Sequence, residues 1–231
     1  NGGDAAIASV MVSELQNTFP DSELMIVTSE DVRGDQKFEG VRQIKSLFFF
    51  AIYAKKQIFF RIFRSLYMLF VTILWCVIYR AINIRLNYLL TTNLKEVLVA
   101  YATNDLVILK GGGYINGKND VNSAVTLVLN LHEILLLLIL GKRIVLYSQS
   151  IGPFGNSFQR YLVKRILNKV DLIFAREGET VEVLKEIEVT CPRVVKTADA
   201  AFLFKSNKKE EMKKYLKVIG VDFDKKIVGI T

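Results

Sequence analysis

The stretch DLVILKGGG, residues 105–113, decides the fold because an uninterrupted apolar run ends in three glycines. An apolar run without alternation is typical of a strand that is buried on both faces of a parallel sheet. Similar runs follow at Arg143–Gln149, Asp171–Glu177 and Arg193–Phe202, and the gaps between them are long enough for helices. Strands that alternate with helices predict an α/β fold with a parallel sheet and right-handed crossovers.

Apolar residues at helical spacing predict the helices that flank this sheet. The predicted helices are Ala5–Asn17, Ser123–Leu140, Phe158–Asn168, Thr180–Ile187 and Lys208–Ile219. ELMIVT, residues 23–28, predicts an earlier strand, and KIVGIT, residues 226–231, predicts a later one. With 231 residues, of which 51% are hydrophobic, the chain can bury a sizeable core.

Glycine-rich and polar clusters follow the predicted strands, where parallel sheets bind their ligands. Lys110–Asp120 and Ser148–Ser157 are predicted as loops. Their backbone N–H groups could approach a phosphate or a sugar closely, or the loops could be plain connections. The opening residues NGGDAAI, 1–7, predict a loop that enters a helix N-terminus, which favours anions. We expect a missing strand before Asn1, which would place this loop at the same rim.

Arg176 directly follows four apolar strand residues. A guanidinium at the carboxyl end of a strand suits bidentate capture of a carboxylate or a phosphate. The alternative is a salt bridge to Glu177, Glu179 or Asp199. Asp199 itself is expected to cap a turn or to position the arginine.

The remaining reactive side chains give little sign of catalysis. His132, the only histidine, lies in a strongly apolar helix, which favours a core or interface residue over a catalytic one. Cys76 and Cys191 match no metal or redox spacing, so we expect free thiols in a reducing compartment. No metal site and no nucleophile–histidine pair is visible.

The net charge of +8 is concentrated in one segment. Nine lysines and arginines and no acidic residue lie between Glu39 and Glu96, and this segment contains the aromatic-rich stretch Leu47–Tyr88. Its uncharged run, residues 65–79, is shorter than the roughly 20 residues of a spanning helix. An interfacial hairpin on an anionic membrane is the preferred interpretation, ahead of a buried helix layer and of a spanning helix. So much apolar surface argues against nucleic acid.

Five motifs in order resemble the polysaccharide pyruvyl transferase family. They are Asn1–Ala6 (similar to N-x-G-D-x-A), Asp105–Gly113, Gln149–Phe154, Ala175–Glu177 and Asp199. The family's usual Asp-Pro is Asp199-Ala200 here. The resemblance implies transfer of the enolpyruvyl group of phosphoenolpyruvate to sugar hydroxyls of cell-surface polysaccharides or exopolysaccharides. A nucleotide-sugar glycosyltransferase of the same fold and a membrane-bound scaffold derived from such an enzyme are the alternatives.

The resemblance also implies a domain organisation. It predicts a GT-B-like enzyme with two Rossmann-like halves, of which residues 1–205 form most of the N-terminal half. Residues 41–90 would be a basic apolar helical insert, and residues 206–231 would link to a truncated second half. The acid–base histidine is expected in that missing half, so we expect the 231 residues alone to be inactive.

Combining the residues with the resemblance gives a candidate substrate site. Its members are Asn1, Gly3, Asp4, Gly111, Gly112, Gly113, Gln149, Ser150, Gly152 and Arg176. Phosphoenolpyruvate is the expected co-substrate, without a further cofactor, and a sugar or a lipid-linked saccharide is the expected acceptor. The expected location is cytoplasmic, as a peripheral protein on the inner face of the membrane.

Overall fold

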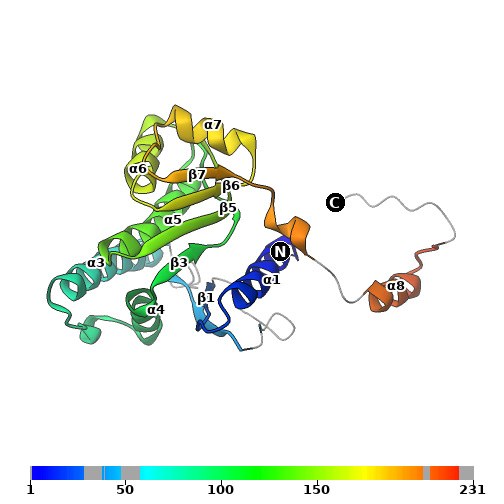
Figure 1. Cartoon of the computed structure of the whole chain (residues 1–231). Coiled ribbons are helices and arrows are strands. Elements are labelled where there is room, and N and C mark those ends of the chain that lie inside the picture. The colour runs from blue at the N-terminus through cyan, green and yellow to red at the C-terminus, as the bar shows by residue number, and fades with distance from the viewer. Residues whose placement is uncertain (1, 29–37, 39, 48–57, 205–208, 224–231) are drawn as a thin grey trace.

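The computed structural model describes residues 2–28, 38, 40–47, 58–204 and 209–223 (Figure 1). Its helices are α1 (Gly2–Thr18), α3 (Ile58–Ile82), α4 (Thr92–Thr103), α5 (Val121–Ile139), α6 (Ser157–Leu167), α7 (Gly178–Glu186) and α8 (Lys209–Val218), with short 3-10 helices η2 (Asn87–Leu89) and η3 (Ala200–Leu203). Its strands are β1 (Met25–Thr28), β2 (Arg42–Lys45), β3 (Leu106–Leu109), β4 (Gly112–Gly117), β5 (Arg143–Phe154), β6 (Leu172–Ala175) and β7 (Arg193–Lys196). The predicted strand at residues 226–231 lies outside the described residues.

The central sheet has the strand order β3–β5–β6–β7, and every pair in it is parallel. Strand β4 also pairs with β5, farther along that strand than β3 does. A separate pair, β1 with β2, is parallel as well. The α/β class, the parallel sheet and the flanking helices are therefore confirmed. Strand β2 lies inside the region 41–90 that was predicted to be a helical insert.

Two predicted loops are strands instead. Gly112 and Gly113 begin β4, and residues 148–154 continue β5, so that Gly112 lies opposite Gln149 and Gly117 opposite Phe154. The glycines therefore continue the line of β3 along β5 rather than turning away from it. The opening segment also differs from its prediction, because Gly2 and Gly3 belong to the first turn of α1. In each place hydrogen bonding to a neighbouring segment or turn outweighed the flexibility of glycine.

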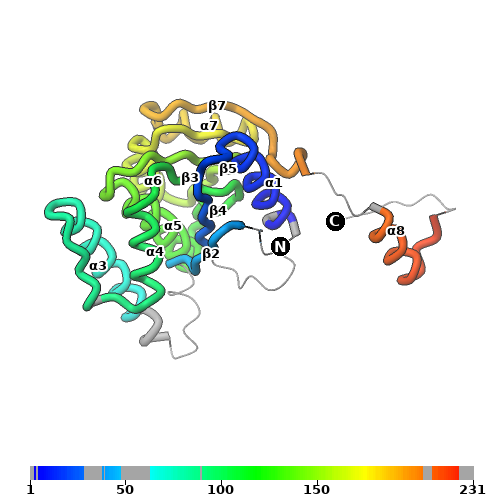
Figure 2. The backbone as a smooth tube through the Cα atoms, turned by 60° about the horizontal axis from the view of Figure 1, so that its bottom comes forward, coloured from blue at the N-terminus to red at the C-terminus, as the bar shows by residue number. Residues whose placement is uncertain are grey.

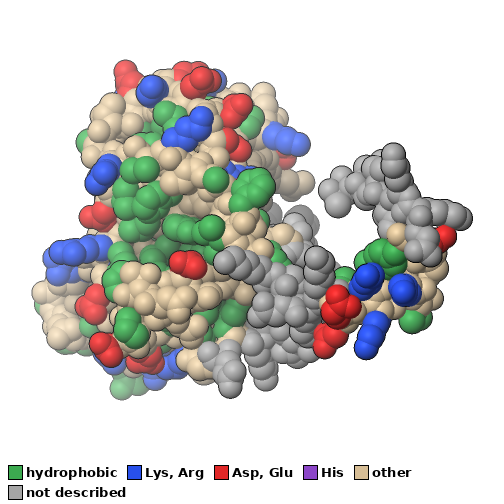
Figure 3. Space-filling view, turned by 45° about the vertical axis from the view of Figure 1, so that its right-hand side comes forward, with side chains coloured by type: hydrophobic (Ala, Val, Ile, Leu, Met, Phe, Trp, Pro, Cys, Tyr) green, Lys and Arg blue, Asp and Glu red, His purple; other side chains and the backbone are tan. Residues whose placement is uncertain are grey.

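One face of the sheet is closed and the other is partly open. Ile144, Leu146 and Ile173 are fully buried. The residues that alternate with them, Tyr147 and Phe174 among them, are only partly buried and meet edge to face, with ring centroids 5.8 Å apart. On the side shown in Figure 3, apolar side chains gather in a band between charged groups. Helix α8 lies apart from the sheet in Figures 1 and 2.

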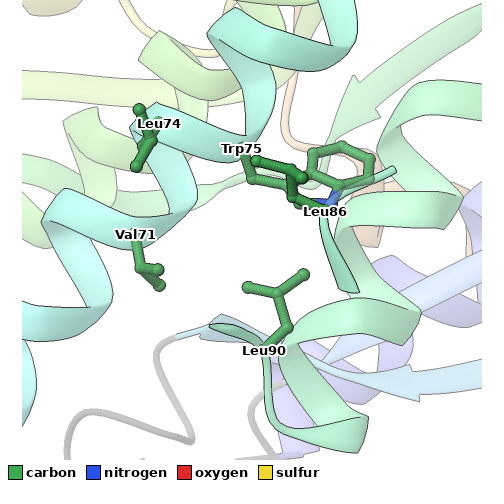
Figure 4. A pocket seen from close by; sticks show the side chains of 5 residues that line it. All are labelled: Val71, Leu74, Trp75, Leu86 and Leu90. Atoms are coloured by element: carbon green, nitrogen blue, oxygen red, sulfur yellow. The ribbon is translucent and has the colours of Figure 1, made fainter. Parts of the chain in front are cut away.

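Helix α3 forms an outer layer over α5 and α4 (Figure 2). Its inner stripe, Met68, Val71, Thr72, Trp75 and Cys76, is buried. Leu86 and Leu90, which follow the helix, close over Val71 and Trp75 (Figure 4). By length and composition alone, residues 63–82 of α3 and all of α5 could cross a membrane. The inner stripe shows that one face of α3 belongs to the core, as the buried-layer interpretation predicted.

Helix α4 was not predicted, although its sequence carries the necessary signal. Leu94, Val97, Leu98 and Tyr101 follow helical spacing, and all four are buried. The preceding Thr91 has the extended backbone of an N-cap residue, but its side chain makes no capping hydrogen bond. The apolar stretch that precedes α4 is much more hydrophobic and masks this ordinary amphipathic pattern in the sequence.

His132 is the buried core residue that the sequence predicted. Its Nε2 lies 2.8 Å from Thr72 Oγ1, which donates its own proton to the Met68 carbonyl at 2.7 Å. The hydrogen bond between His132 Nε2 and Thr72 Oγ1 ties α5 to α3. Burial lowers the pKa of His132 from 6.5 to about 4.

The lowered pKa of His132 predicts a loss of stability in mild acid. Below pH 6.5 the imidazole of His132 is protonated in the unfolded chain, whereas in the folded chain it stays neutral down to about pH 4. Protonation therefore favours the unfolded state as the pH falls. We expect the free energy of unfolding to drop by about 2 kcal/mol between pH 7 and pH 5 from this group. Urea titrations should show this, and His132→Leu should remove that part of the pH dependence. An equal pH dependence in both proteins would contradict the assignment.

Candidate substrate-binding site

The candidate residues meet where β6 ends. Ala175, the last residue of β6, lies opposite Gln149 of β5, which in turn lies opposite Gly112 of β4. Strand β5 runs on past this point, so Ser150 and its successors extend beyond the end of β6. Three clusters that are far apart in the sequence thus lie side by side at the carboxyl edge of the sheet, as predicted.

Arg176 stands at the centre of this edge. Its Nε donates to the Ser150 hydroxyl, and its Nη1 donates to Asp199 Oδ2 at 2.9 Å. Glu177 Oε2 is 3.7 Å from Nε, and the side chain of Arg176 is 26% exposed. The predicted salt bridges to Asp199 and Glu177 are therefore present. Nη2 makes no hydrogen bond to the described part of the chain, so one end of the oriented guanidinium can still donate to a ligand.

Asp199 fixes the turn that follows β7 as well as the arginine. Its second oxygen, Oδ1, accepts from the Ala201 amide at 2.9 Å and caps η3. Ser148 Oγ accepts from the neighbouring Ala200 amide at 3.1 Å. Ala200 is buried against Ile7 of α1, one turn after Gly3. The first turn of α1 therefore lies close to this edge, although Asn1 and the Asp4 side chain lie outside the described residues.

Gln149 is wholly buried, so it does not offer its amide to solvent. Its Nε2 donates to the Lys110 carbonyl at 2.6 Å and to Tyr114 Oη at 2.7 Å. Its Oε1 is buried without a hydrogen-bond partner among the described residues. Burial, and secondarily the charge of Glu133, raises the pKa of Tyr114. Gln149 therefore braces β4 against β5 beneath the edge.

The predicted glycines differ in how closely neighbouring atoms approach the position that a Cβ atom would occupy. A Cβ at Gly111 would lie 2.5 Å from the Ser148 carbonyl oxygen and 2.8 Å from that of Tyr147. A Cβ at Gly152, where φ is +85°, would lie 2.9 Å from Val183 Cγ1 of α7. Gly113 is exposed, and the nearest atom to its Cβ position is Ser150 Cβ at 3.9 Å. Close packing explains Gly111 and Gly152, whereas Gly113 leaves open space beside Ser150.

Gly111→Ala should destabilise the protein, because backbone oxygens of the central strand cannot move aside cheaply. We expect a loss of about 1–3 kcal/mol in the free energy of unfolding, measured by urea titration. Gly113→Ala is the matched control, since its methyl group meets only ordinary van der Waals contacts. Equal stabilities of the two variants would show that the close approach at Gly111 is not required.

Several residues that hold this edge were missed from the sequence. Thr180 Oγ1 accepts from the Ile151 amide at 3.0 Å, which satisfies β5 beyond the end of β6. Tyr114 and Ser148 also make the contacts given above, and Ser148 has a positive φ of 53°. Their partners are 29 to 52 residues away in the sequence, so no local pattern could reveal them.

Two pockets in the described part of the chain lie away from this edge. One is lined by Trp75 and its apolar neighbours, and the other, of about 380 Å³, is lined by residues of β1, β2 and α4. The second has the Arg42–Glu96 ion pair, 2.9 Å, in its wall. Within the described ranges, no group of three or more His, Cys, Asp or Glu side chains could hold a metal ion.

Comparison with known proteins identifies the family to which these motifs point. The family model described as polysaccharide pyruvyl transferase matches residues 1–230, nearly the whole chain. No curated protein and no solved structure matches the chain at a significant level.

Proposed function

Since the chain belongs to the polysaccharide pyruvyl transferase family, we propose that it uses phosphoenolpyruvate to pyruvylate a sugar of a cell-surface polysaccharide or exopolysaccharide. The family match supports a transferase of polysaccharide pyruvylation. The observation that supports the donor is Arg176, which is oriented at the sheet edge by Ser150 and Asp199 and keeps Nη2 available. A guanidinium in this position suits the carboxylate or the phosphate of a small dianion.

A second cation supports a doubly charged donor. Lys196 ends β7 opposite Ala175, and its Nζ lies 3.5 Å from the Cβ position of Gly178, the first residue of α7. The carboxylates of Asp199 and Glu177 carry two negative charges against the one positive charge of Arg176, so Lys196 is needed to bring this cluster to neutrality before a dianion can bind. We assign Arg176 to one anionic group of the donor, with Lys196 and the first turn of α7 close to the other.

The reaction adds a sugar oxygen to C2 of phosphoenolpyruvate while C3 takes a proton. Loss of phosphate and addition of a second sugar hydroxyl to C2 give the pyruvate ketal, so the products are the ketal and inorganic phosphate. An acid–base group is required for these proton transfers. His132 cannot supply it, because it is buried and bonded to Thr72. As the family resemblance implies, we propose a GT-B-like enzyme in which this chain is the N-terminal lobe and a second lobe carries that group.

The acceptor proposed here is a sugar or a lipid-linked saccharide on the cytoplasmic face of a membrane. The basic apolar segment between Glu39 and Glu96 supports this setting, since its positive charge is attracted to the negative charge of an anionic leaflet. A glycosyltransferase that uses a nucleotide sugar is the rival function, because Arg176 and a helix N-terminus could equally bind a diphosphate.

The deciding experiment supplies labelled donors to membranes that contain the complete enzyme, with both proposed lobes. Carbon-labelled phosphoenolpyruvate should transfer its label to saccharide, with release of phosphate, while a labelled nucleotide sugar should not. Membranes without the protein provide the background. Transfer from the nucleotide sugar alone would overturn the proposal in favour of the glycosyltransferase.

A further inference from the structure

Helix α3 carries two apolar stripes on opposite sides. The inner stripe is buried against α4 and α5, and the outer stripe is defined here as Phe63, Leu66, Phe70 and Val77. At about 100° per residue, the outer stripe lies on the side of the helix opposite the inner one. Phe63 and Phe70 are 67% and 69% exposed, so packing within the described structure does not account for them.

The apolar surface continues at the turn after α3. Ile82, Ile84 and Tyr88 are exposed, Tyr88 almost completely at 99%. Arg80 and Arg85 are exposed in the same stretch of sequence; the Arg80 guanidinium lies beside Gly141, just after α5, and the Arg85 guanidinium is 6.0 Å from the centre of the Tyr79 ring. Tyrosine and arginine beside exposed aliphatic groups are typical of side chains at the level of lipid headgroups.

The charges of this region indicate what binds to the outer stripe. No acidic residue lies between Glu39 and Glu96, where nine basic residues occur, and no charged residue interrupts α3 from Ser65 to Tyr79. An apolar stripe with basic flanks complements an anionic lipid surface, because the acyl boundary accepts the stripe and the headgroups attract the cations. A protein partner would need a surface that is both apolar and acidic.

The inner stripe decides how α3 meets the lipid. Trp75 and Cys76 are buried in the core, and Thr72 is bonded to His132 of α5. A spanning helix would have to withdraw these residues and break that bond, so the helix must lie along the membrane instead. From Phe63 to Val77 the outer stripe then covers about 21 Å of the surface.

We propose that the outer stripe of α3 and the turn after it form a docking surface for anionic phospholipid membranes, with α3 parallel to the bilayer plane. This deepens the proposed membrane location. It uses a surface separate from Arg176, and vesicle binding needs neither donor nor acceptor. A failure here therefore leaves the proposed transfer reaction untouched.

Co-sedimentation of the purified chain with vesicles tests the surface. The chain should bind vesicles containing phosphatidylglycerol at low salt, bind phosphatidylcholine vesicles much more weakly, and lose affinity as salt is added. Phe70→Glu should weaken binding about tenfold or more. Phe158→Glu is the matched control, because Phe158 on α6 is 66% exposed and lies outside the stripe. The proposal would be overturned if both variants weakened vesicle binding equally or if neither weakened it. It would also be overturned if Phe70→Glu dissociated a dimer of the chain while vesicle binding persisted.

Tryptophan fluorescence tests the orientation, because Trp75 is the only tryptophan and lies on the inner stripe. Brominated lipids should leave the emission of the natural chain unchanged. They should quench the emission that Phe70→Trp adds on the outer stripe. Quenching of Trp75 in the natural chain would show that α3 leaves the core and spans, and absence of quenching in both proteins would show that α3 does not reach the lipid.

Discussion

Replacing Arg176 with lysine should lower kcat/KM for phosphoenolpyruvate by about a hundredfold, mostly through KM. The guanidinium holds Ser150 and Asp199 with two nitrogens, and in the proposed complex its third nitrogen binds the donor. An ammonium group has no planar fork and cannot serve all three at once. Steady-state kinetics with varied phosphoenolpyruvate measure the change, in membranes that contain the complete enzyme with this substitution.

Arg160→Lys is the control for Arg176→Lys. Arg160 also makes an ion pair, with Glu186, but both side chains are exposed and the pair lies away from the sheet edge. Its replacement should leave the kinetics unchanged. If Arg176→Lys shifts only the melting temperature and leaves KM as it was, Arg176 has a purely structural role and the donor site must be elsewhere.

Trp75→Ala should cost about 3–5 kcal/mol of folding free energy, the largest stability effect that we expect. The indole is 1% exposed and stacks on Tyr79, with ring centroids 5.1 Å apart and planes 4° from parallel. Leu86 and Leu90 close over it (Figure 4), so truncation would leave a cavity between α3 and the turn after it. Chemical denaturation followed by circular dichroism measures the loss.

Trp75→Phe separates the packing of the ring from its polar group. The indole Nε1 is buried without a hydrogen-bond partner among the described residues, so its removal leaves no acceptor unsatisfied. We expect a loss of about 1 kcal/mol, because phenylalanine keeps most of the apolar contact. A loss as large as that of Trp75→Ala would mean that Nε1 donates to a group outside the described residues.

The spacing of apolar residues in the sequence predicted most of the helices and strands, because that spacing follows which side chains are buried. The run that includes Leu106 to Leu109 and the spacing in α5 and α6 predicted elements whose ends agree with the structure within a few residues. Glycine misled the prediction at residues 111–113 and 148–154. A high glycine content shows that the backbone of a segment can form a turn. It does not show that hydrogen bonds to a neighbouring strand keep the segment extended.

The candidate site was predictable only in part. Arg176 and its partner Asp199 followed from the expected strand ends, because parallel strands bring their carboxyl ends to one edge. The contact with Ser150, the burial of Gln149 and the support from Thr180 depend on the register between strands. That register is set by packing across the sheet, so it cannot be predicted from the sequence of any single segment.

Because the buried and the exposed apolar stripes of α3 lie on opposite sides of the helix, the exposed one can be changed without disturbing the core. Since Phe63, Leu66, Phe70 and Val77 make no part of the buried core, glutamine or lysine can replace all four without creating a void. A chain recoded in this way should stay dispersed without detergent and keep its fold. It would be a practical starting point for crystals and for calorimetry of donor binding in plain buffer.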